Sequence, residues 1–326
     1  MSEVITIGEP LVTFCSKEPD VSLTDALEFH KIMGGAELNV AIGVKRLGHS
    51  VEYVTRVGQD PMGKFVQKTI DACHVGTKYV SYDDYYYTGH QMKQLVTHGD
   101  PVVVNYRHDS AACHLKEDQL DKIDLSNVKI AHMSGIFPAI SDIAENTFRV
   151  FYQKLINANK FITFDPNLRP SLWKSKEYMI ETVNELAGMA DIVLPGIEEG
   201  KILVGTDSPE EIANFYLRGK RTQAVMVKLG EQGIFVKTSK NKKYTVPGFK
   251  ATKVIDTVGA GDGFALGLIT ALLEGKSLKS AAVRGNAVGC LQVQTLGDND
   301  GYPTVKELKR FYEKQGFSED EATSCN

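Results

Sequence analysis

Short β-rich runs alternate with longer amphipathic runs along most of this chain, and the alternation limits the folds open to it. Six brief, branched runs end in Gly or Pro and are predicted strands: VITIGEP, VEYVTRVG, VKIAHMSG, KFITFDPN, ADIVLPG and QAVMVKLG. Helical patterns cover residues 36–47, 61–72, 141–158, 177–189 and 209–218, and then residues 260–274, 278–294 and 304–314. This order predicts an α/β fold in which helices cover both faces of a mostly parallel sheet.

The composition is that of an ordinary globular protein. The 326 residues are enough for one large α/β domain, and 42% hydrophobic with 24% charged residues can form a well-buried core. A net charge of −4 without a basic stripe excludes nucleic acid as the main partner. No segment approaches the roughly 18 apolar residues of a membrane span, so we expect a soluble, cytoplasmic protein. Five scattered cysteines without CxxC pairs disfavour a disulfide framework or a zinc site.

Residues 10–33 and 80–110 interrupt the alternation. In the second segment, two strand-like runs flank the turn His98-Gly99-Asp100-Pro101, which predicts a hairpin. Either a small sheet attached to the main domain or a decorative surface hairpin would explain the pattern. We expect a single domain over residues 1–316, followed by a polar tail, residues 317–326, that frays.

Four Gly- or Pro-rich loops follow predicted strands or open a predicted helix: DPNLRP, LPGIEEG, KLGEQG and TVGAGDG. In open α/β sheets, ligands bind outside the carboxyl ends of the strands, so these loops should meet in one crevice.

The stretch DTVGAGDGFALG, residues 256–267, is the strongest candidate for chemistry. Glycines at 259, 261 and 263 let the backbone approach a ligand, and a helix N-terminus favours an anion. Asp262 would compete with a bound phosphate unless it takes a proton from an attacking hydroxyl. The alternative is an ordinary N-terminal acid beside glycines that permit tight packing, and composition alone slightly favours it.

A P-loop is excluded as the phosphate-binding device. The triplet Gly275-Lys276-Ser277 has Thr270 where the motif requires glycine, and it follows a helix instead of a strand. Gly275 is better explained as the end of one helix, with Ser277 as the N-cap of the next.

Two further polar residues are each either ligand-binding residues or ordinary surface residues. Asn39, on the helix after Gly34 and Gly35, lies off the apolar face and is either a sugar ligand or a solvated surface residue. Arg169 in DPNLRP is either a carboxylate-binding residue or a member of a surface ion pair.

Taken together, GG…N…A…RLG, DPNLRP, KLGEQG and DTVGAGDGF resemble the ribokinase-like (PfkB) carbohydrate kinase family from Gly8 to about Leu308. Within the family, YRHDSAACHL, DPNLRPSLW and LPGIEEGKILVG are most similar to 2-keto-3-deoxygluconate kinases. The resemblance implies a Rossmann-type sheet flanked by helices, with a small β-sheet lid formed by residues of about 10–33 and 80–110. It also implies phosphorylation of a sugar hydroxyl by ATP, with Asp262 as base.

The resemblance further assigns residues to the two substrates and to the transferred group. The N–H groups of Gly259, Ala260 and Gly261 would form the anion hole. The expected sugar ligands are Gly34, Gly35, Asn39, Gln91, Asn105, Arg107, Arg169 and Asp298. The expected nucleotide ligands are Asn167, Lys228, Gly230, Gly233 and Asn286. ATP would bring Mg²⁺, and the use of a monovalent cation stays open.

Three positions depart from the family pattern. The magnesium-associated Asn-x-x-Glu is here Gly196-Ile197-Glu198-Glu199, so Glu199 alone remains, and we expect it to hold the metal through water. Two tyrosines of ketodeoxygluconate kinases are replaced by Asn105 and Gln91. These changes affect the part of the site that would recognise the sugar.

The leading hypothesis is a kinase that converts 2-keto-3-deoxygluconate to its 6-phosphate. The alternatives are a fructokinase or other neutral-sugar kinase, and a sugar-binding regulator without catalysis, against which Asp262 argues. An edge hairpin exposes unpaired strand groups, so we expect a homodimer or larger homo-oligomer paired through the lid.

Overall fold

A computed structural model describes residues 2–99 and 101–317 and shows one large sheet. In chain order its strands are β1 (Val4–Ile7), β4 (Val51–Gly58), β5 (Gly76–Asp83), β8 (Ile130–Ser134), β9 (Phe161–Asp165), β10 (Ile192–Val193), β11 (Ala224–Lys228), β12 (Ile234–Thr238) and β13 (Lys243–Val246). Their order across the sheet is β13-β12-β11-β10-β9-β8-β1-β4-β5. The seven strands from β11 to β5 are parallel, and β12 and β13 extend the sheet antiparallel. All six predicted strands are confirmed in the parallel part.

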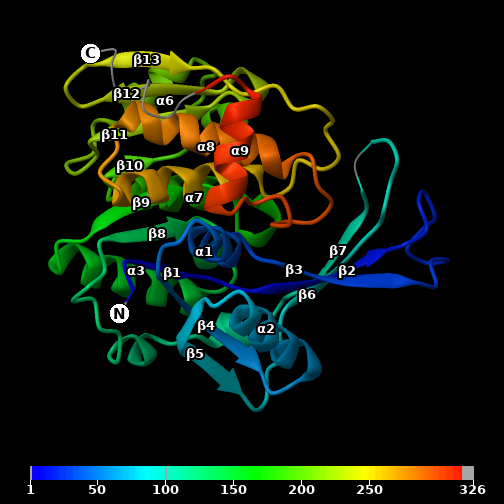
Figure 1. The fold of residues 1–326 in the computed structure, drawn as a ribbon. Coiled ribbons are helices and arrows are strands. Elements are labelled where there is room, and N and C mark those ends of the chain that lie inside the picture. The colour runs from blue at the N-terminus through cyan, green and yellow to red at the C-terminus, as the bar shows by residue number, and fades with distance from the viewer. Residues whose placement is uncertain (1, 100, 318–326) are drawn as a thin grey trace.

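Helices cover both faces of this sheet (Figure 1). They are α1 (Ala36–Arg46), α2 (Pro61–Ala72), α3 (Asp142–Asn157), α4 (Lys176–Ala187), α5 (Ile197–Leu203), α6 (Pro209–Tyr216), α7 (Ala260–Leu273), α8 (Leu278–Gln292) and α9 (Val305–Lys314). Apolar residues of α1, α7 and α8 pack together on one face, and those of α3, α4 and α6 pack on the other. The eight predicted helices are confirmed. Helix α5 was not predicted, because its seven residues are too few to show a helical period.

A separate four-stranded sheet projects from the body at the right of Figure 1. Its strands are β2 (Leu11–Ser16), β3 (Phe29–Gly34), β6 (His90–Lys93) and β7 (Val103–Tyr106), in the order β3-β2-β6-β7. Strands β6 and β7 pair antiparallel, as the predicted hairpin requires, although Asp100 of its turn lies outside the described residues. The segment expected from residue 80 begins too early, because residues 80–83 complete β5 of the large sheet.

The junction between α7 and α8 shows why the chain has no P-loop there. Gly275 has a φ of +75°, a conformation that favours glycine after a helix end. The Ser277 hydroxyl then accepts the Ser280 N–H at 3.1 Å and caps α8. Both roles agree with the prediction. Within the described ranges, no helix is both long and apolar enough to cross a membrane. Most of the predicted polar tail, residues 318–326, lies outside the described residues.

Candidate active site

Two cavities flank the N-terminus of α7. The first, of about 890 Å³, lies beside α7, α8 and the start of β12, and we name it the glycine-lined cavity. Its glycines are Gly230, Gly233, Gly248, Gly261, Gly285 and Gly289. Lys228 and Asn286 also line it, so it contains four of the five residues expected to bind nucleotide. The Asn286 amide donates to the carbonyls of Val246 and Pro247 at 3.1 and 3.0 Å, which ties α8 to the end of β13.

The second cavity, of about 590 Å³, is bounded by the small sheet and by loops that follow the strands of the large sheet; we name it the charged cavity. The residues lining it include Gly35, Asn39, Gln91, Asn105, Arg107, Asn167, Arg169, Asp262 and Asp298. The resemblance places Asn167 between the sugar and the phosphates, among the nucleotide ligands; in the structure it lines this cavity and not the glycine-lined one. Gly34 does not line the cavity; a Cβ there would lie 2.5 Å from Asp298 Oδ2, so glycine allows that carboxylate to approach.

Lys228, Thr257 and Gly261 line both cavities, so the two spaces meet beside the start of α7. Lys228 Nζ lies 2.7 Å from Asp165 Oδ2. Burial by itself would lower the pKa of Lys228, but the carboxylates of Asp165 and Glu199 outweigh it and raise the pKa. A cation therefore stands where the cavities join.

The Asp262 carboxylate lies in the wall of the charged cavity and is oriented by two amides. Asn39 Nδ2 donates to it at 2.9 Å, and Asn167 Nδ2 does so at 3.5 Å. Asn39 is itself fixed, because its side-chain oxygen accepts from Asn299 Nδ2 at 2.9 Å. Asn39 is only 2% exposed, so the interpretation of a solvated surface residue is wrong. Removal of water by the surrounding protein raises the pKa of Asp262 to about 7, into the range of an effective general base.

The backbone ahead of Asp262 presents unpaired donors. Gly259 is the N-cap of α7, with a φ of +78°, and a Cβ there would lie 1.9 Å from the Asp298 carbonyl oxygen, so only glycine fits. Within the described residues, the N–H groups of Gly259 and Gly261 have no partner. The Ala260 N–H donates to Thr257 O at 3.3 Å, so this third expected amide is engaged in a turn. Free amides at a helix N-terminus form an anion site.

Glu199 is committed to the backbone. Its two carboxylate oxygens accept the N–H groups of Leu168 and Gly196 at 2.9 and 2.6 Å, and the residue lines neither cavity. Across residues 2–99 and 101–317, no group of three or more His, Cys, Asp or Glu side chains could hold a metal ion. The residues present therefore fit Mg²⁺ that is held mainly by phosphate oxygens and water.

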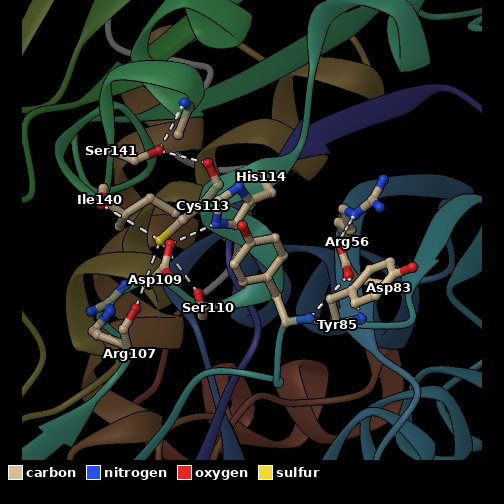
Figure 2. A network of polar contacts seen from close by, with 12 residues as sticks. Arg56, Asp83, Tyr85, Arg107, Asp109, Ser110, Cys113, His114, Ile140 and Ser141 are labelled. Carbon is tan, nitrogen blue, oxygen red and sulfur yellow. Dashed lines mark hydrogen bonds and ion pairs between the residues drawn. The ribbon is translucent and has the colours of Figure 1, made fainter.

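Arg107 forms a close ion pair inside the charged cavity. Its Nε and Nη2 donate to Glu9 Oε2 at 2.8 and 2.5 Å, and the Ser110 hydroxyl donates to the other Glu9 oxygen at 2.6 Å. Figure 2 shows that Cys113 contacts Ser110, the Arg107 carbonyl and the Ile140 carbonyl, which holds the chain that carries the arginine. Much of the Arg107 charge is thus offset within the protein.

Arg169 differs from Arg107. Its Nη1 donates to Asn167 Oδ1 and to the Leu168 carbonyl, both at 2.9 Å. Among the described residues, no carboxylate lies within ion-pair distance of it, so the interpretation as part of a surface ion pair is not supported. Its positive charge still lowers the pKa values of Asp262 and Asp298, although burial leaves both raised.

Four ionisable residues that line this cavity were not predicted from the sequence: Glu9, Glu37, Lys93 and Asp165. Glu9 and Asp165 had a signal, since each stands at or just after the carboxyl end of a predicted strand. Glu37 is 1% exposed and its carboxylate oxygens have no hydrogen-bond partner in the described part of the chain, so burial raises its pKa to about 8. Nothing local distinguishes Glu37 or Lys93 from a surface residue.

Comparison with known proteins identifies the family to which this chain belongs. The model of the pfkB family carbohydrate kinases matches residues 1–305. The 2-dehydro-3-deoxygluconokinase of Bacillus subtilis (strain 168) is 40% identical over 315 residues, which cover 96% of each chain. A PfkB protein from Polaromonas sp. JS666 is 39% identical with a TM-score of 0.86, over 95% of this chain and 99% of that one.

Two further solved structures contain ligands. An uncharacterized sugar kinase from Pyrococcus horikoshii in complex with ATP has a TM-score of 0.79 and 28% identity, over 96% of this chain and 99% of that one. A double mutant of fructokinase from Vibrio cholerae O395, with fructose, ADP and potassium ion bound, has a TM-score of 0.83 and 27% identity, over 95% and 98%. The present protein is therefore a carbohydrate kinase. It belongs to the PfkB family.

Proposed function

We propose that this kinase transfers the γ-phosphoryl group of ATP to 2-keto-3-deoxygluconate and forms its 6-phosphate. The observation that carries the proposal is the place of Asp262, in the wall of the charged cavity and beside the free Gly261 amide where the cavities meet. The name of the Bacillus subtilis relative supports this substrate.

In the proposed reaction, Asp262 accepts the proton of the attacking sugar hydroxyl. The amides of Asn39 and Asn167 hold the carboxylate in place, and a pKa of about 7 makes it an effective base near neutral pH. The amides of Gly259 and Gly261 and the Lys228 ammonium would hold the transferring group, because phosphoryl transfer depends on positioning and charge stabilisation. Mg²⁺ brought with ATP would neutralise phosphate charge and would be held mainly by phosphate oxygens and water. Glu199, whose two oxygens accept backbone N–H groups, would contact it only through water.

The charged cavity also bears on the choice between a sugar acid and a neutral sugar. Arg169 has no carboxylate partner among the described residues and is available for a substrate carboxylate. Three other cations are already paired, Lys93 with Asp256, Arg107 with Glu9 and Lys228 with Asp165. Since a single uncommitted cation is a modest carboxylate site, a neutral sugar such as fructose is the second candidate, and the fructose-bound structure agrees with it.

A panel of ATP-coupled assays tests the proposal. We expect the highest kcat/KM with 2-keto-3-deoxygluconate, lower values with other six-carbon sugar acids, and the lowest with fructose. Phosphorus NMR of the product would identify the phosphorylated hydroxyl. Faster turnover with fructose would reverse the order of the two candidates, and sugar binding without turnover would favour the regulator.

We also propose that the small sheet forms the interface of a homodimer. The edge strand β7 is exposed along its length, including Val103, Val104 and Tyr106. Exposed apolar edge strands are normally covered. A strictly monomeric mass in light scattering would contradict this.

A further inference from the structure

One ion pair joins the small sheet to the loop that leads into α7. Lys93, the last residue of β6, places its Nζ 2.7 Å from Oδ2 of Asp256. The two side chains are only 12% and 14% exposed, so solvent screens the pair weakly. In the part of the chain that the structure describes, no other hydrogen bond or ion pair joins a strand of the small sheet to residues 254–262.

The same carboxylate also shapes the loop. Asp256 Oδ1 accepts the Val258 N–H at 3.0 Å, an Asx turn that directs the chain toward Gly259. Asp256 is therefore bonded to the small sheet through one oxygen and to the backbone ahead of the free amides through the other. A displacement of Lys93 acts on the residue that sets the conformation of this loop.

The pair also lies next to the junction of the two cavities. Lys93 lines the charged cavity, whereas Thr257, directly after Asp256, lines both cavities. A sugar that contacts the small sheet and a nucleotide that contacts the loop would each favour one arrangement of this pair. Two ligands that favour the same arrangement bind cooperatively, and the effect is reciprocal.

We propose that the Lys93–Asp256 pair couples the two substrate sites, so that bound nucleotide raises the affinity for sugar and bound sugar raises the affinity for nucleotide. The proposal rests on the proposed assignment of the cavities to sugar and ATP. Neither residue touches the reacting atoms in this scheme. Both are positioning residues. Their role is therefore measured by the ratio of the sugar affinities with and without nucleotide, and not by either affinity alone.

The test is calorimetric and uses the full chain. The dissociation constant of 2-keto-3-deoxygluconate is measured with and without a nonhydrolysable ATP analogue. In the wild type we expect the analogue to tighten sugar binding about fivefold or more. In Lys93→Met, which keeps the apolar stem and removes the charge, the tightening by nucleotide should fall below about twofold. Because Lys93 lines the charged cavity, the affinity without nucleotide is measured separately, and the ratio of the two affinities tests the coupling.

Lys17→Met is the matched control. Lys17 directly follows β2 of the same sheet and pairs with exposed Glu28, away from α7, so this variant should keep the wild-type ratio. Asp256→Asn is the second variant, because an asparagine oxygen can still accept the Val258 N–H. It should lose coupling as Lys93→Met does, and the double variant should lose no more than either single one.

Several outcomes would overturn the coupling. The first is a folded Lys93→Met protein in which the ATP analogue still tightens sugar binding as much as in the wild type. The second is a wild-type protein whose sugar affinity does not change with the analogue. The third is a Lys17→Met variant that loses as much of the tightening as Lys93→Met. Failure of the proposed substrate is separate, since it would appear as turnover with another sugar, and the same ratio is then measured with that sugar.

Discussion

The two cavities that meet at Lys228 differ in the kinds of residues that line them. The residues that line the glycine-lined cavity include six glycines and several apolar residues. The charged cavity is lined by five carboxylates and four cations: Glu9, Glu37, Asp165, Asp262, Asp298, Lys93, Arg107, Arg169 and Lys228. Backbone amides bind phosphate whatever the side chains are, whereas a sugar is recognised by side chains that must be placed individually. A substitution in the glycine-lined cavity should therefore change mainly the kinetics with ATP, whereas a substitution in the charged cavity should change mainly the kinetics with sugar.

The largest expected effect comes from Asp262, the proposed base in the charged cavity. Asp262→Asn should lower kcat by about 10²–10⁴-fold, because the amide cannot accept the hydroxyl proton. The sugar dissociation constant, measured by calorimetry, should stay within about threefold of wild type. Asp300→Asn, an exposed acid nearby, should leave both quantities unchanged. Unaltered turnover in Asp262→Asn would show that another group is the base.

A methyl group at Gly261, where the two cavities meet, should slow phosphoryl transfer without destabilising the fold. In Gly261→Ala the nearest side-chain atom to the new Cβ is Lys228 Nζ at 3.6 Å, which is an ordinary contact. Alanine also favours the helix, so the melting temperature should stay equal or rise. Displacement of the phosphate should lower kcat/KM for ATP by about 100-fold, whereas sugar affinity stays constant. Gly188→Ala, at the end of α4, is the control, and normal ATP kinetics in Gly261→Ala would contradict the proposed path.

Arg169 should contribute more to the kcat/KM for a sugar acid than to that for a neutral sugar. A charge-assisted hydrogen bond contributes about 1.5–3 kcal/mol. Arg169→Gln should thus lower kcat/KM for a sugar acid by about 10- to 100-fold and change that for fructose far less. Arg169→Lys should recover part of the loss. Equal losses with both sugars would mean that Arg169 holds the loop and not the carboxylate.

The pH dependence reports the environment of the base. In the proposed reaction the deprotonated carboxylate of Asp262 is the active form, and the pKa of this group is about 7. The kcat/KM for sugar should therefore rise by about tenfold from pH 6 to pH 8 and level off above that. The residual activity of Asp262→Asn should lack this step. A wild-type profile that is flat over this range would contradict the raised pKa.

The raised pKa of Asp262 also predicts a small effect of pH on the stability of the folded protein. The folded protein keeps the Asp262 proton up to about pH 7, whereas the unfolded chain loses it near pH 4, so stability from this group is present at low pH and lost as the pH rises through 7. Asp262→Asn should melt a few degrees higher than wild type at pH 8, and the difference should shrink toward pH 4. Calorimetric scans at both pH values measure it, and a lower melting temperature at pH 8 would contradict the assignment.

The features that sequence predicted are local ones. Six strands, eight helices and the caps at Gly275 and Ser277 follow from periodicity and turn chemistry within a few residues. The loop before Asp262 was visible for the same reason, since its glycines are neighbours in the chain. The extra antiparallel strands β12 and β13 and the short helix α5 lacked such a signal.

The charge pattern of the charged cavity depended on tertiary structure. The Arg107–Glu9, Lys93–Asp256 and Asn39–Asp262 contacts join residues 98, 163 and 223 positions apart. The family resemblance assigned Arg107 to the carboxylate or nearby hydroxyls of the sugar, but the fold pairs it with Glu9. The fold also pairs Lys93, which was not predicted from the sequence, with Asp256. Sequence by itself determined the order of strands and helices and the glycine-rich turn before Asp262, because backbone conformation depends on near neighbours. Tertiary structure alone decided which charges remain unpaired beside the base, because Coulomb energies depend on distances in space and on water removed by folding.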